Sequence, residues 1–303
     1  MKVLVVGSRG QLGRELVRQG RSQGVAMHAA GKDRMDITDI SGVQQVIAEY
    51  RPSIVINAAA YTDVDRAEME PELAFAVNKA GPANLAQSCA KHKISLIQIS
   101  TDYVFDGAKE TPYLEEDPIA PIGVYGRSKA EGEAAIRSSL QQHIIVRTSW
   151  LYGVYGHNFV KTMLRLAKEK ETIRVVADQF GSPTSASDLA AALLKISQYV
   201  QTSALGPWGT YHYCGQGIAT WHAFAEKILE LASAYEAIRT TRIIPIKTEE
   251  YPTRAKRPTF SALDCGRIQK LFDIKRQPWQ ESLAITIDRM YSNEAPSDYG
   301  HGE

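Results

Sequence analysis

The fold of this chain is decided by a stretch near its start, Val3-Leu4-Val5-Val6-Gly7-Ser8-Arg9-Gly10-Gln11-Leu12-Gly13. Its four leading apolar residues predict a strand that is buried on both faces. The glycines permit a tight turn and let backbone N–H groups approach a pyrophosphate, which also gains from the dipole of the helix expected from Arg14 onward. The spacing differs from the commoner Gly-x-Gly-x-x-Gly, so the pattern is informative only between a strand and a helix. We interpret it as a dinucleotide-binding turn; the alternative is a purely structural glycine turn.

Apolar runs and helical patterns alternate through the first half of the chain. Strands are expected at residues 25–30, 53–57, 94–99, 144–146 and 173–177. Helices are expected between them, including one over residues 71–91 that kinks or breaks at Pro82. This alternation predicts an α/β fold, a Rossmann-like doubly wound parallel sheet with a smaller, partly discontinuous C-terminal α/β substrate domain.

The expected domain boundaries follow from where the strand pattern weakens. Residues 1–152, together with about 172–216, are assigned to an NAD(P)-binding Rossmann domain. Residues 153–171 and 217–292 are assigned to a substrate-binding domain. Residues 293–303 are polar with Gly and Pro, and we predict a disordered tail there.

Composition excludes several classes of function. The 303 residues carry a formal net charge of +1, which gives no reason to invoke nucleic acid or acidic membranes. No apolar run approaches the roughly 18 residues of a membrane span, and no signal-peptide pattern opens the chain. The three cysteines are widely spaced and predict reduced thiols rather than a metal site or a disulfide framework. We therefore expect a cytoplasmic protein without a structural metal.

A second informative stretch is Gly123-Val124-Tyr125-Gly126-Arg127-Ser128-Lys129. Tyr125 and Lys129 are four residues apart, so on a helix both side chains leave from one face. A phenol has a pKa of about 10 in water, and a neighbouring ammonium lowers that pKa towards the range of a general acid or base. The alternative is a tyrosine at a helix start beside a surface lysine. The preceding nucleotide-binding pattern favours the catalytic interpretation.

Polar side chains follow two of the expected strands. Ser100, Thr101 and Asp102 end the strand at 94–99, and Trp150 closely follows the strand at 144–146. Ligands of open parallel sheets bind at the carboxyl ends of strands, so these residues are candidates for one site. Strand-end polar residues can also be simple caps.

The end of the second strand bears on the choice of cofactor. NAD-specific enzymes usually place an acidic residue there to bind the ribose 2′-hydroxyl, but this strand ends in Ala29-Ala30-Gly31. Asp33 comes late and lies between Lys32 and Arg34, whose cations can receive a 2′-phosphate. We predict NADPH, with NADH still usable; a solvated loop of mixed charge is the alternative.

A basic loop with prolines occurs late in the chain and contains Pro252, Arg254, Lys256, Arg257 and Pro258. A solvated charge run is the usual meaning of such a cluster. Placed opposite the sheet edge, Arg254 and Arg257 would instead bind the diphosphate of a substrate, because guanidinium groups suit bidentate phosphate contacts.

Together these stretches resemble the extended, nucleotide-sugar-modifying branch of the short-chain dehydrogenase/reductase superfamily, and within it the dTDP-4-dehydrorhamnose reductase family. The resemblance also rests on Asn57-Ala58-Ala59-Ala60-Tyr61-Thr62, Arg147-Thr148-Ser149-Trp150, Asn158-Phe159-Val160-Lys161-Thr162-Met163, Asp178-Gln179-Phe180-Gly181-Ser182-Pro183-Thr184 and Tyr251-Pro252-Thr253-Arg254. It spans nearly the whole chain. It implies reduction of the C4 ketone of dTDP-6-deoxy-L-lyxo-4-hexulose by NADPH in a monomer or homodimer. The rivals are another nucleotide-sugar epimerase, dehydratase or reductase, and a non-catalytic NADP-binding regulatory subunit.

The resemblance also implies roles for individual residues. Tyr125 is the implied proton donor, Lys129 binds the nicotinamide ribose and lowers the tyrosine pKa, and the Thr101 hydroxyl contacts the sugar and the tyrosine. Asp102 and Trp150 are implied substrate contacts. The implied cofactor-binding residues, besides Tyr125 and Lys129, are Gly7, Gly10, Gln11, Leu12, Gly13, Asp36, Ile37, Ala59, Ala60, Tyr61 and Thr62.

The sequence departs from the family pattern at two places. The family often has Asn where this chain has Gly123, so one polar contact of the site is missing. Some members bind Mg²⁺ at a dimer contact through several glutamates; Glu15 matches the first, but the one expected near Ser187 is absent. No metal site is therefore predicted.

Overall fold

The computed structural model describes residues 1–203 and 206–292, and its centre is a six-stranded parallel sheet in the order β10-β5-β4-β3-β1-β2. The strands are β1 (Lys2–Val6), β2 (Ala26–Ala30), β3 (Ile54–Asn57), β4 (Ser95–Thr101), β5 (His143–Thr148) and β10 (Gly209–His212). The chain leaves β1 towards β2 and then continues on the other side of β1 through β3, β4 and β5. This reversal is the topological switch point of a doubly wound fold, so the predicted fold class is confirmed.

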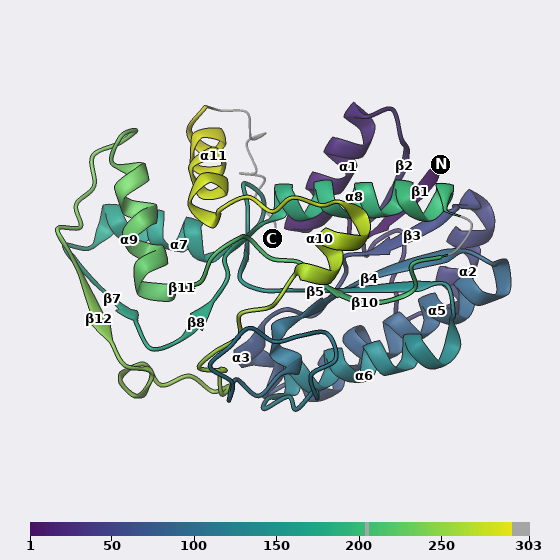
Figure 1. The fold of residues 1–303 in the computed structure, drawn as a ribbon, viewed down its shortest axis with the longest axis horizontal. Helices are drawn as coiled ribbons and strands as arrows, with labels where there is room; N and C mark the ends of the chain where they lie inside the picture. The colour runs from purple at the N-terminus through teal and green to yellow at the C-terminus, as the bar shows by residue number, and fades with distance from the viewer. Residues whose placement is uncertain (204–205, 293–303) are drawn as a thin grey trace.

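Helices cover both faces of the sheet (Figure 1). One face carries α1 (Gln11–Ser22) and α8 (Ala186–Thr202), which pack against each other. The opposite face carries α2 (Ile40–Tyr50), α5 (Gly81–His92) and α6 (Val124–Ser139). Val3 and Val5 belong to the core under the first pair of helices, whereas Leu4 and Val6 belong to the core under the second group. Successive strand residues point to opposite faces, which is why β1 reads as an unbroken apolar run.

The helical pattern at 71–91 is interrupted, as predicted from Pro82. The segment consists of α4 (Pro71–Phe75), the π-helical turn η1 (Ala76–Ala80) and α5. Pro82 lies in the first turn of α5, where a missing backbone N–H costs nothing. The π-helical turn ends at Ala80, two residues before the proline, so the irregularity precedes Pro82.

A smaller unit has its own hydrophobic core. It contains α7 (Phe159–Glu169), β7 (Thr172–Val176), α9 (Trp221–Ala232), β12 (Arg242–Ile246) and α11 (Trp279–Tyr291). In Figure 1 these elements lie to one side of the main sheet. The remaining elements are short: α3 (Val64–Ala67), η2 (Asp102–Val104), β6 (Leu151–Tyr152), β8 (Phe180–Gly181), β9 (Thr184–Ser185), β11 (Ala219–Thr220), η3 (Thr248–Glu250) and α10 (Gly266–Phe272).

The expectation that residues 173–177 form the sixth strand of the central sheet is wrong. The segment forms β7, but β7 pairs in parallel with β12 of the smaller unit, and β10 is the sixth strand of the central sheet. Thr172 and Arg174 are exposed while Ile173 and Val175 are buried. Such alternation marks a strand with one solvated face, whereas an interior strand of a covered parallel sheet is buried on both sides.

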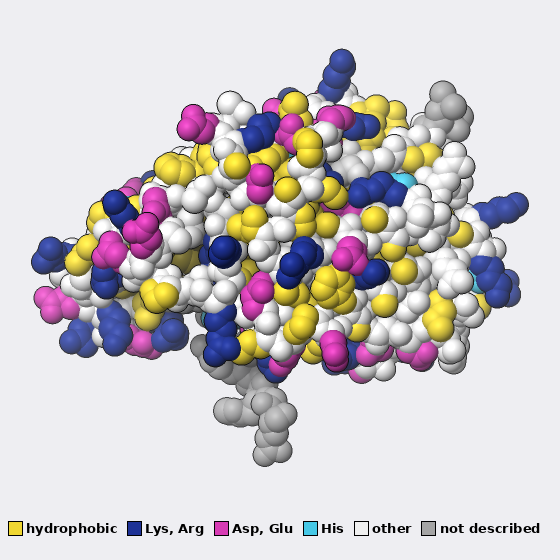
Figure 2. Space-filling view, turned by 90° about the horizontal axis from the view of Figure 1, so that it is seen from below, with side chains coloured by type: hydrophobic (Ala, Val, Ile, Leu, Met, Phe, Trp, Pro, Cys, Tyr) yellow, Lys and Arg dark blue, Asp and Glu magenta, His cyan; other side chains and the backbone are white. Residues whose placement is uncertain are grey.

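Two further predictions concern membrane spans and the C-terminal tail. No described helix is both long and apolar enough to cross a membrane. The tail predicted at 293–303 lies outside the described residues. Figure 2 shows acidic, basic and apolar side chains intermixed on the face it displays, in keeping with the balanced formal charge.

Candidate functional site

The turn between β1 and α1 has the geometry of a diphosphate cradle. Gly7 adopts φ +74°, and a Cβ atom on Gly13 would lie 2.2 Å from the Gly7 carbonyl oxygen, so both positions require glycine. Gly10 is the N-cap of α1, and its side-chain position is open except for Gly7 O at 3.4 Å. No side chain of the described residues caps α1 at its N-terminus. The positive end of this 12-residue helix is thus free to receive an anion.

The segment after β3 lies against this turn. A Cβ atom on Gly7 would be 2.6 Å from the Ala59 nitrogen, so the backbone of residues 58–59 packs directly on the glycine turn. Asn78 then holds the next part of the segment, because its Oδ1 accepts from the Tyr61 N–H (2.9 Å) and its Nδ2 donates to the Tyr61 carbonyl (3.0 Å). Asn78 also donates to Ser128 Oγ at 3.0 Å, which links the segment to α6.

Two other expected cofactor residues flank the turn. The Asp36 carboxylate accepts from the backbone N–H (2.9 Å) and hydroxyl (2.8 Å) of Thr38, and the backbone bond is the main reason that the pKa of Asp36 is lowered. Ile37 is buried in the core, and its carbonyl accepts from Asn84 Nδ2 at 2.9 Å. Its side chain therefore packs in the core on the face of the sheet that carries α2 and α5.

Tyr125 stands in the first turn of α6. The N-cap Gly123 offers no side chain, and the Val124 N–H instead donates to Glu68 Oε1 at 2.7 Å. A Cβ atom on Gly123 would lie 2.9 Å from that same oxygen. The family departure at Gly123 is thus matched by Glu68, a residue that sequence reasoning missed. The Tyr125 ring meets the Tyr103 ring edge-on, with centroids 5.5 Å apart.

The protonation of Tyr125 differs from expectation. Burial raises its pKa to about 12, the neighbouring Thr101 side chain opposes the rise, and the Asp102 charge adds to it. The lowering of the Tyr125 pKa that was expected from the charge of Lys129 is not found. Lys129 Nζ donates to the Ile99 carbonyl at 2.6 Å, and burial lowers its own pKa to about 8 while the charge of Glu133 opposes that shift. Desolvation outweighs the opposing charge of Glu133 at Lys129, whereas at Tyr125 the charge of Asp102 acts in the same direction as desolvation.

Thr101 and Asp102 join Tyr125 at the end of β4. The Thr101 hydroxyl donates to Asp102 Oδ1 at 3.0 Å and accepts from the Tyr103 N–H at 3.2 Å. Asp102 is 2 % exposed, and burial raises its pKa to about 6, while the neighbouring side chains of Ser261 and Thr101 oppose the rise. The structure therefore brings together Tyr125, Thr101 and Asp102, as the sequence predicted.

Trp150 lies just beyond β5 in a left-handed conformation, φ +46°. Its indole stacks on Trp221 at 3.6 Å, and Gly181 leaves room for it, since a Cβ there would lie 2.5 Å from the ring. A tryptophan with positive φ is strained and persists only where the surroundings fix it. Trp221 packs in the core of the smaller unit and also lines a cavity.

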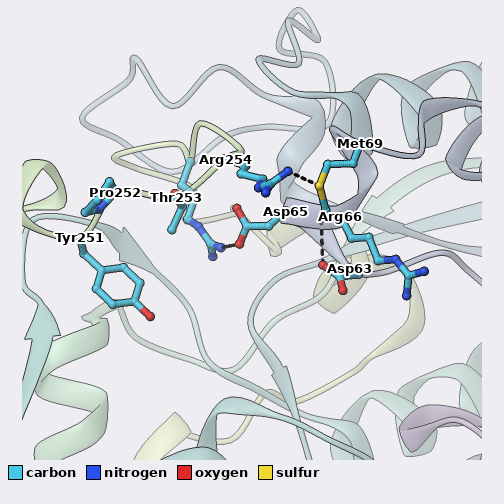
Figure 3. A pocket seen from close by; sticks show the side chains of 9 residues that line it. Asp63, Asp65, Arg66, Met69, Tyr251, Pro252, Thr253 and Arg254 are labelled. Carbon is cyan, nitrogen blue, oxygen red and sulfur yellow. Dashed lines mark hydrogen bonds and ion pairs between the residues drawn. The ribbon is translucent and has the colours of Figure 1, made fainter.

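A cavity of about 900 Å³ separates the main sheet from the smaller unit. Its walls come from the segment 62–65, the start of α7, β7, Trp221 and the basic loop. A neighbouring cavity of about 460 Å³ is lined by Asp63, Asp65, Arg66, Met69, Tyr251, Pro252, Thr253, Arg254 and Arg257 (Figure 3). Thr62 lines the larger cavity, whereas Tyr125, Thr101, Asp102 and Trp150 line neither.

The two arginines of the basic loop differ in position. Arg257 lines both cavities, and its Nη2 lies 2.5 Å from Asp65 Oδ2. Asp65 Oδ1 also accepts from the Ala255 N–H at 3.0 Å, which pins the loop to α3. Arg254 lines only the smaller cavity and contacts the Met69 sulfur, as Figure 3 shows. Sequence reasoning missed Asp65, because nothing local links it to a loop 192 residues later.

Most of the cationic side chains near the end of β2 form ion pairs with carboxylates. Arg34 binds Glu49 through two contacts of 2.7 and 2.6 Å, and Lys32 lies 3.8 Å from Asp36. Arg9, within the glycine turn, reaches across to Asp33 at 2.8 Å, and its Nε lies 3.1 Å from where a Gly31 Cβ would be. Arg9 was not singled out from the sequence, although a cation inside the turn was a usable signal.

Glu15 is 1 % exposed and is held by two arginines. Arg18 Nη2 lies 2.8 Å from Oε2, and Arg289 Nη2 lies 2.9 Å from Oε1. Nearby, Gln19 Nε2 donates to the carbonyl (2.8 Å) and the hydroxyl (3.0 Å) of Ser187. Within residues 1–203 and 206–292, no group of three or more His, Cys, Asp or Glu residues is arranged to hold a metal ion.

Similarity to known proteins extends along nearly the whole chain. The model of the family described as RmlD substrate binding domain matches residues 1–292. A dTDP-4-dehydrorhamnose reductase of Aggregatibacter actinomycetemcomitans is 42 % identical over 287 residues, covering 93 % of this chain and 97 % of the relative. A solved reductase of the same name from Clostridium acetobutylicum superposes with TM-score 0.89 and 39 % identity, covering 95 % and 99 % of the two chains. The Bacillus anthracis reductase, solved in complex with NADP, superposes with TM-score 0.87 and 41 % identity. The match covers 95 % of this chain and 100 % of that chain.

Proposed function

The chain belongs to the dTDP-4-dehydrorhamnose reductase family, and from that premise we propose how its residues perform the family's reaction. It is an NADPH-dependent oxidoreductase of dTDP-rhamnose synthesis, reducing the C4 ketone of dTDP-6-deoxy-L-lyxo-4-hexulose. When bound, NADPH supplies the hydride for that ketone.

The cofactor is assigned to the β1–α1 turn. Gly7, Gly10 and Gly13 bring backbone close to the diphosphate, and the uncapped end of α1 supplies the positive dipole. Gln11 and Leu12 begin that helix, and the segment Ala59, Ala60, Tyr61 and Thr62 forms the adjoining wall, fixed by Asn78. Asp36 and Ile37, which follow β2, are proposed as further cofactor contacts. Arg9 and Lys32 lie by the end of β2 and are proposed to receive the 2′-phosphate in exchange for their partners Asp33 and Asp36, whereas Arg34 makes two contacts with Glu49 of α2.

The single observation that carries the catalytic proposal is the position of Tyr125 in the first turn of α6, beside the Thr101 side chain at the end of β4, with a phenol pKa raised to about 12. Such a phenol holds its proton at neutral pH and gives it up only to a stronger base. The alkoxide that develops at C4 is such a base, so Tyr125 protonates it. Thr101 orients the phenol, and Lys129 binds the ribose beside the nicotinamide.

The sugar nucleotide is assigned to the larger cavity. Arg257 on its wall supports binding of the diphosphate, and exchange of its partner Asp65 for phosphate leaves the arginine charge balanced. Arg254 is proposed as an outer contact from the smaller cavity. Asp102 and Trp150 are proposed to contact the sugar ring where β4 and β5 end.

We propose the same two-domain division as above, with residues 172–176 moved to the substrate unit because β7 pairs with β12. The protein is further proposed to act as a monomer or homodimer in the cytoplasm. Three buried free cysteines support a reducing compartment.

Turnover with the purified protein tests the function. NADPH oxidation is followed at constant cofactor with dTDP-6-deoxy-L-lyxo-4-hexulose and with a panel of other nucleotide 4-keto-sugars. Stoichiometric oxidation with formation of dTDP-L-rhamnose is the expected result. Product formed without net NADPH oxidation would favour an epimerase or dehydratase, and NADPH binding without turnover would favour a regulatory subunit.

A further inference from the structure

A buried ion pair lies one helical turn beyond Lys129. Glu133 of α6 is 1 % exposed and Arg147 of β5 is 3 % exposed. They meet in a bidentate contact, with Arg147 Nε 2.9 Å from Oε1 and Nη2 2.8 Å from Oε2 of the carboxylate. Neither charge has a place in the chemistry described above, and burying both costs desolvation free energy that the pair only partly recovers.

The pair connects the three elements that carry the site. Arg147 lies opposite Ser100 in the β4–β5 register, so its bidentate contact with Glu133 ties α6 to both strands. The next residue of β4 is Thr101, and Trp150 follows three residues after Arg147. Glu133 therefore anchors α6, with Tyr125 and Lys129, to the strand ends that carry the other site residues.

The charges around Lys129 single out Glu133. On α6, Arg137 also reaches Glu133, at 3.1 Å, and Tyr125 keeps its proton. Lys79 of η1 pairs with Glu131 at the surface. Other titratable groups on the neighbouring elements include Asp65 and Arg66 of α3, Asp102 and Tyr103 of η2, Glu72 of α4, Cys89, Lys91 and His92 of α5, His143 and Arg147 of β5, and beyond it His212 of β10. Burial and Arg147 lower the pKa of His212 to about 3, so His212 is neutral. Glu133 is the anion that raises the pKa of Lys129 against burial.

We propose that Glu133, held by Arg147, is a positioning residue for catalysis: its carboxylate keeps the buried Lys129 ammonium charged and fixes α6 on β4 and β5. The proposal rests on the assignment of Lys129 to the nicotinamide ribose. Without Glu133, two cations, Lys129 and Arg147, would remain buried in the same part of the molecule with no buried carboxylate between them. Lys129 would then lose its proton at lower pH.

Two single variants test the proposal, because it predicts that they shift the alkaline limb of the pH profile in opposite directions. The readouts are the pH dependence of the NADPH Kd, from cofactor fluorescence, and of kcat/KM. The wild type should show an alkaline limb near the pKa of Lys129, about 8. Glu133→Gln keeps the shape of the side chain but removes its charge, and should move this limb down by about one pH unit. Arg147→Met removes one of the two arginines that neutralise Glu133, so more of the carboxylate charge acts on Lys129, and the limb should move up.

Glu131→Gln is the matched control, since Glu131 lies on the same helix with its side chain 46 % exposed, and it should leave the limb in place. If both buried variants lower the melting temperature but leave the limb unmoved, or move it in one direction, the pair is merely structural and the proposal is wrong. Should one variant fail to fold, the direction of shift in the other still decides. A limb that persists in Lys129→Met would instead contradict the role of Lys129, and hence the proposed function.

Discussion

Arg257 Nη2 lies 2.5 Å from Asp65 Oδ2, so a loop near the end of the chain is tied to the segment that follows β3 across the mouth of the larger cavity. The contact holds the guanidinium in place before any phosphate arrives. It also sets a difference between the two arginines of the loop, because Arg254 contacts the Met69 sulfur instead.

Arg257→Ala should raise the KM for the sugar nucleotide by roughly ten- to a hundredfold, since a charge-assisted contact is worth about 1.5–3 kcal/mol. The KM for NADPH should hardly change, because its diphosphate is assigned to the Gly10 turn. Arg254→Ala is the matched control and should have a smaller effect on the sugar-nucleotide KM. If neither substitution changes that KM, the loop is a solvated charge run and the diphosphate is held elsewhere.

The buried Asp102 carboxyl should make stability depend on pH. Its pKa is raised from 3.8 in the unfolded chain to about 6 by burial, so the folded state holds the proton more tightly. The stability gained from this group is fully present below about pH 3.8 and is lost as pH rises through 6. Asp102→Asn should therefore gain stability relative to wild type over this window, by up to about 3 kcal/mol.

Urea unfolding of both proteins between pH 4 and about pH 8 measures this difference. Asp273→Asn, at a side chain that is 91 % exposed, is the control and should show a small difference that does not follow this window. A constant difference between wild type and Asp102→Asn across the range would mean that the carboxyl is not perturbed.

Cofactor preference depends on Arg9 in the proposal. NADPH should give the higher kcat/KM, with NADH still usable, because β2 ends without a carboxylate and Arg9 faces that end. Arg9→Ala should reduce the preference about tenfold or more by weakening NADPH and leaving NADH nearly unchanged. Arg34→Ala, whose guanidinium already binds Glu49, serves as comparison and should change it less. A wild-type preference for NADH would refute the assignment.

Activity should survive removal of divalent metal. The Glu15 carboxylate is neutralised by Arg18 and Arg289, so no bound cation is required to balance its charge. Dialysis against EDTA followed by steady-state assay tests this, with Ca²⁺ and Mg²⁺ added back separately. Loss of turnover that Mg²⁺ alone restores would show that the absence of a glutamate near Ser187 was misinterpreted.

The sequence predicted those features that local pattern determines. The buried run at Val3–Val6, the glycine turn and the break near Pro82 all follow from backbone sterics and from strand burial. The strand at 172–176 formed as expected, but its partner was misassigned, because strand propensity says nothing about which sheet accepts a strand. The alternation of Thr172, Ile173, Arg174 and Val175 was the overlooked signal.

Electrostatics and distant partners were beyond the reach of the sequence. The spacing of Tyr125 and Lys129 placed them correctly on α6, yet the direction of the tyrosine pKa shift depends on how much protein surrounds both groups. Asp65 and Glu68 act through contacts with Arg257 and Val124, which lie far along the chain. Such pairings are set by tertiary packing and leave no trace in local spacing.

The role of Tyr125 as proton donor is the central claim, and one variant tests it most directly. Tyr125→Phe keeps the ring that packs against Tyr103 but removes the hydroxyl beside the Thr101 side chain. The account predicts a fall in kcat of roughly 100-fold or more, the usual scale for a positioned acid, with the NADPH Kd nearly unchanged. Lys129→Ala, in comparison, should impair both kcat and cofactor binding. A Tyr125→Phe protein whose kcat stays near the wild-type value would contradict the account.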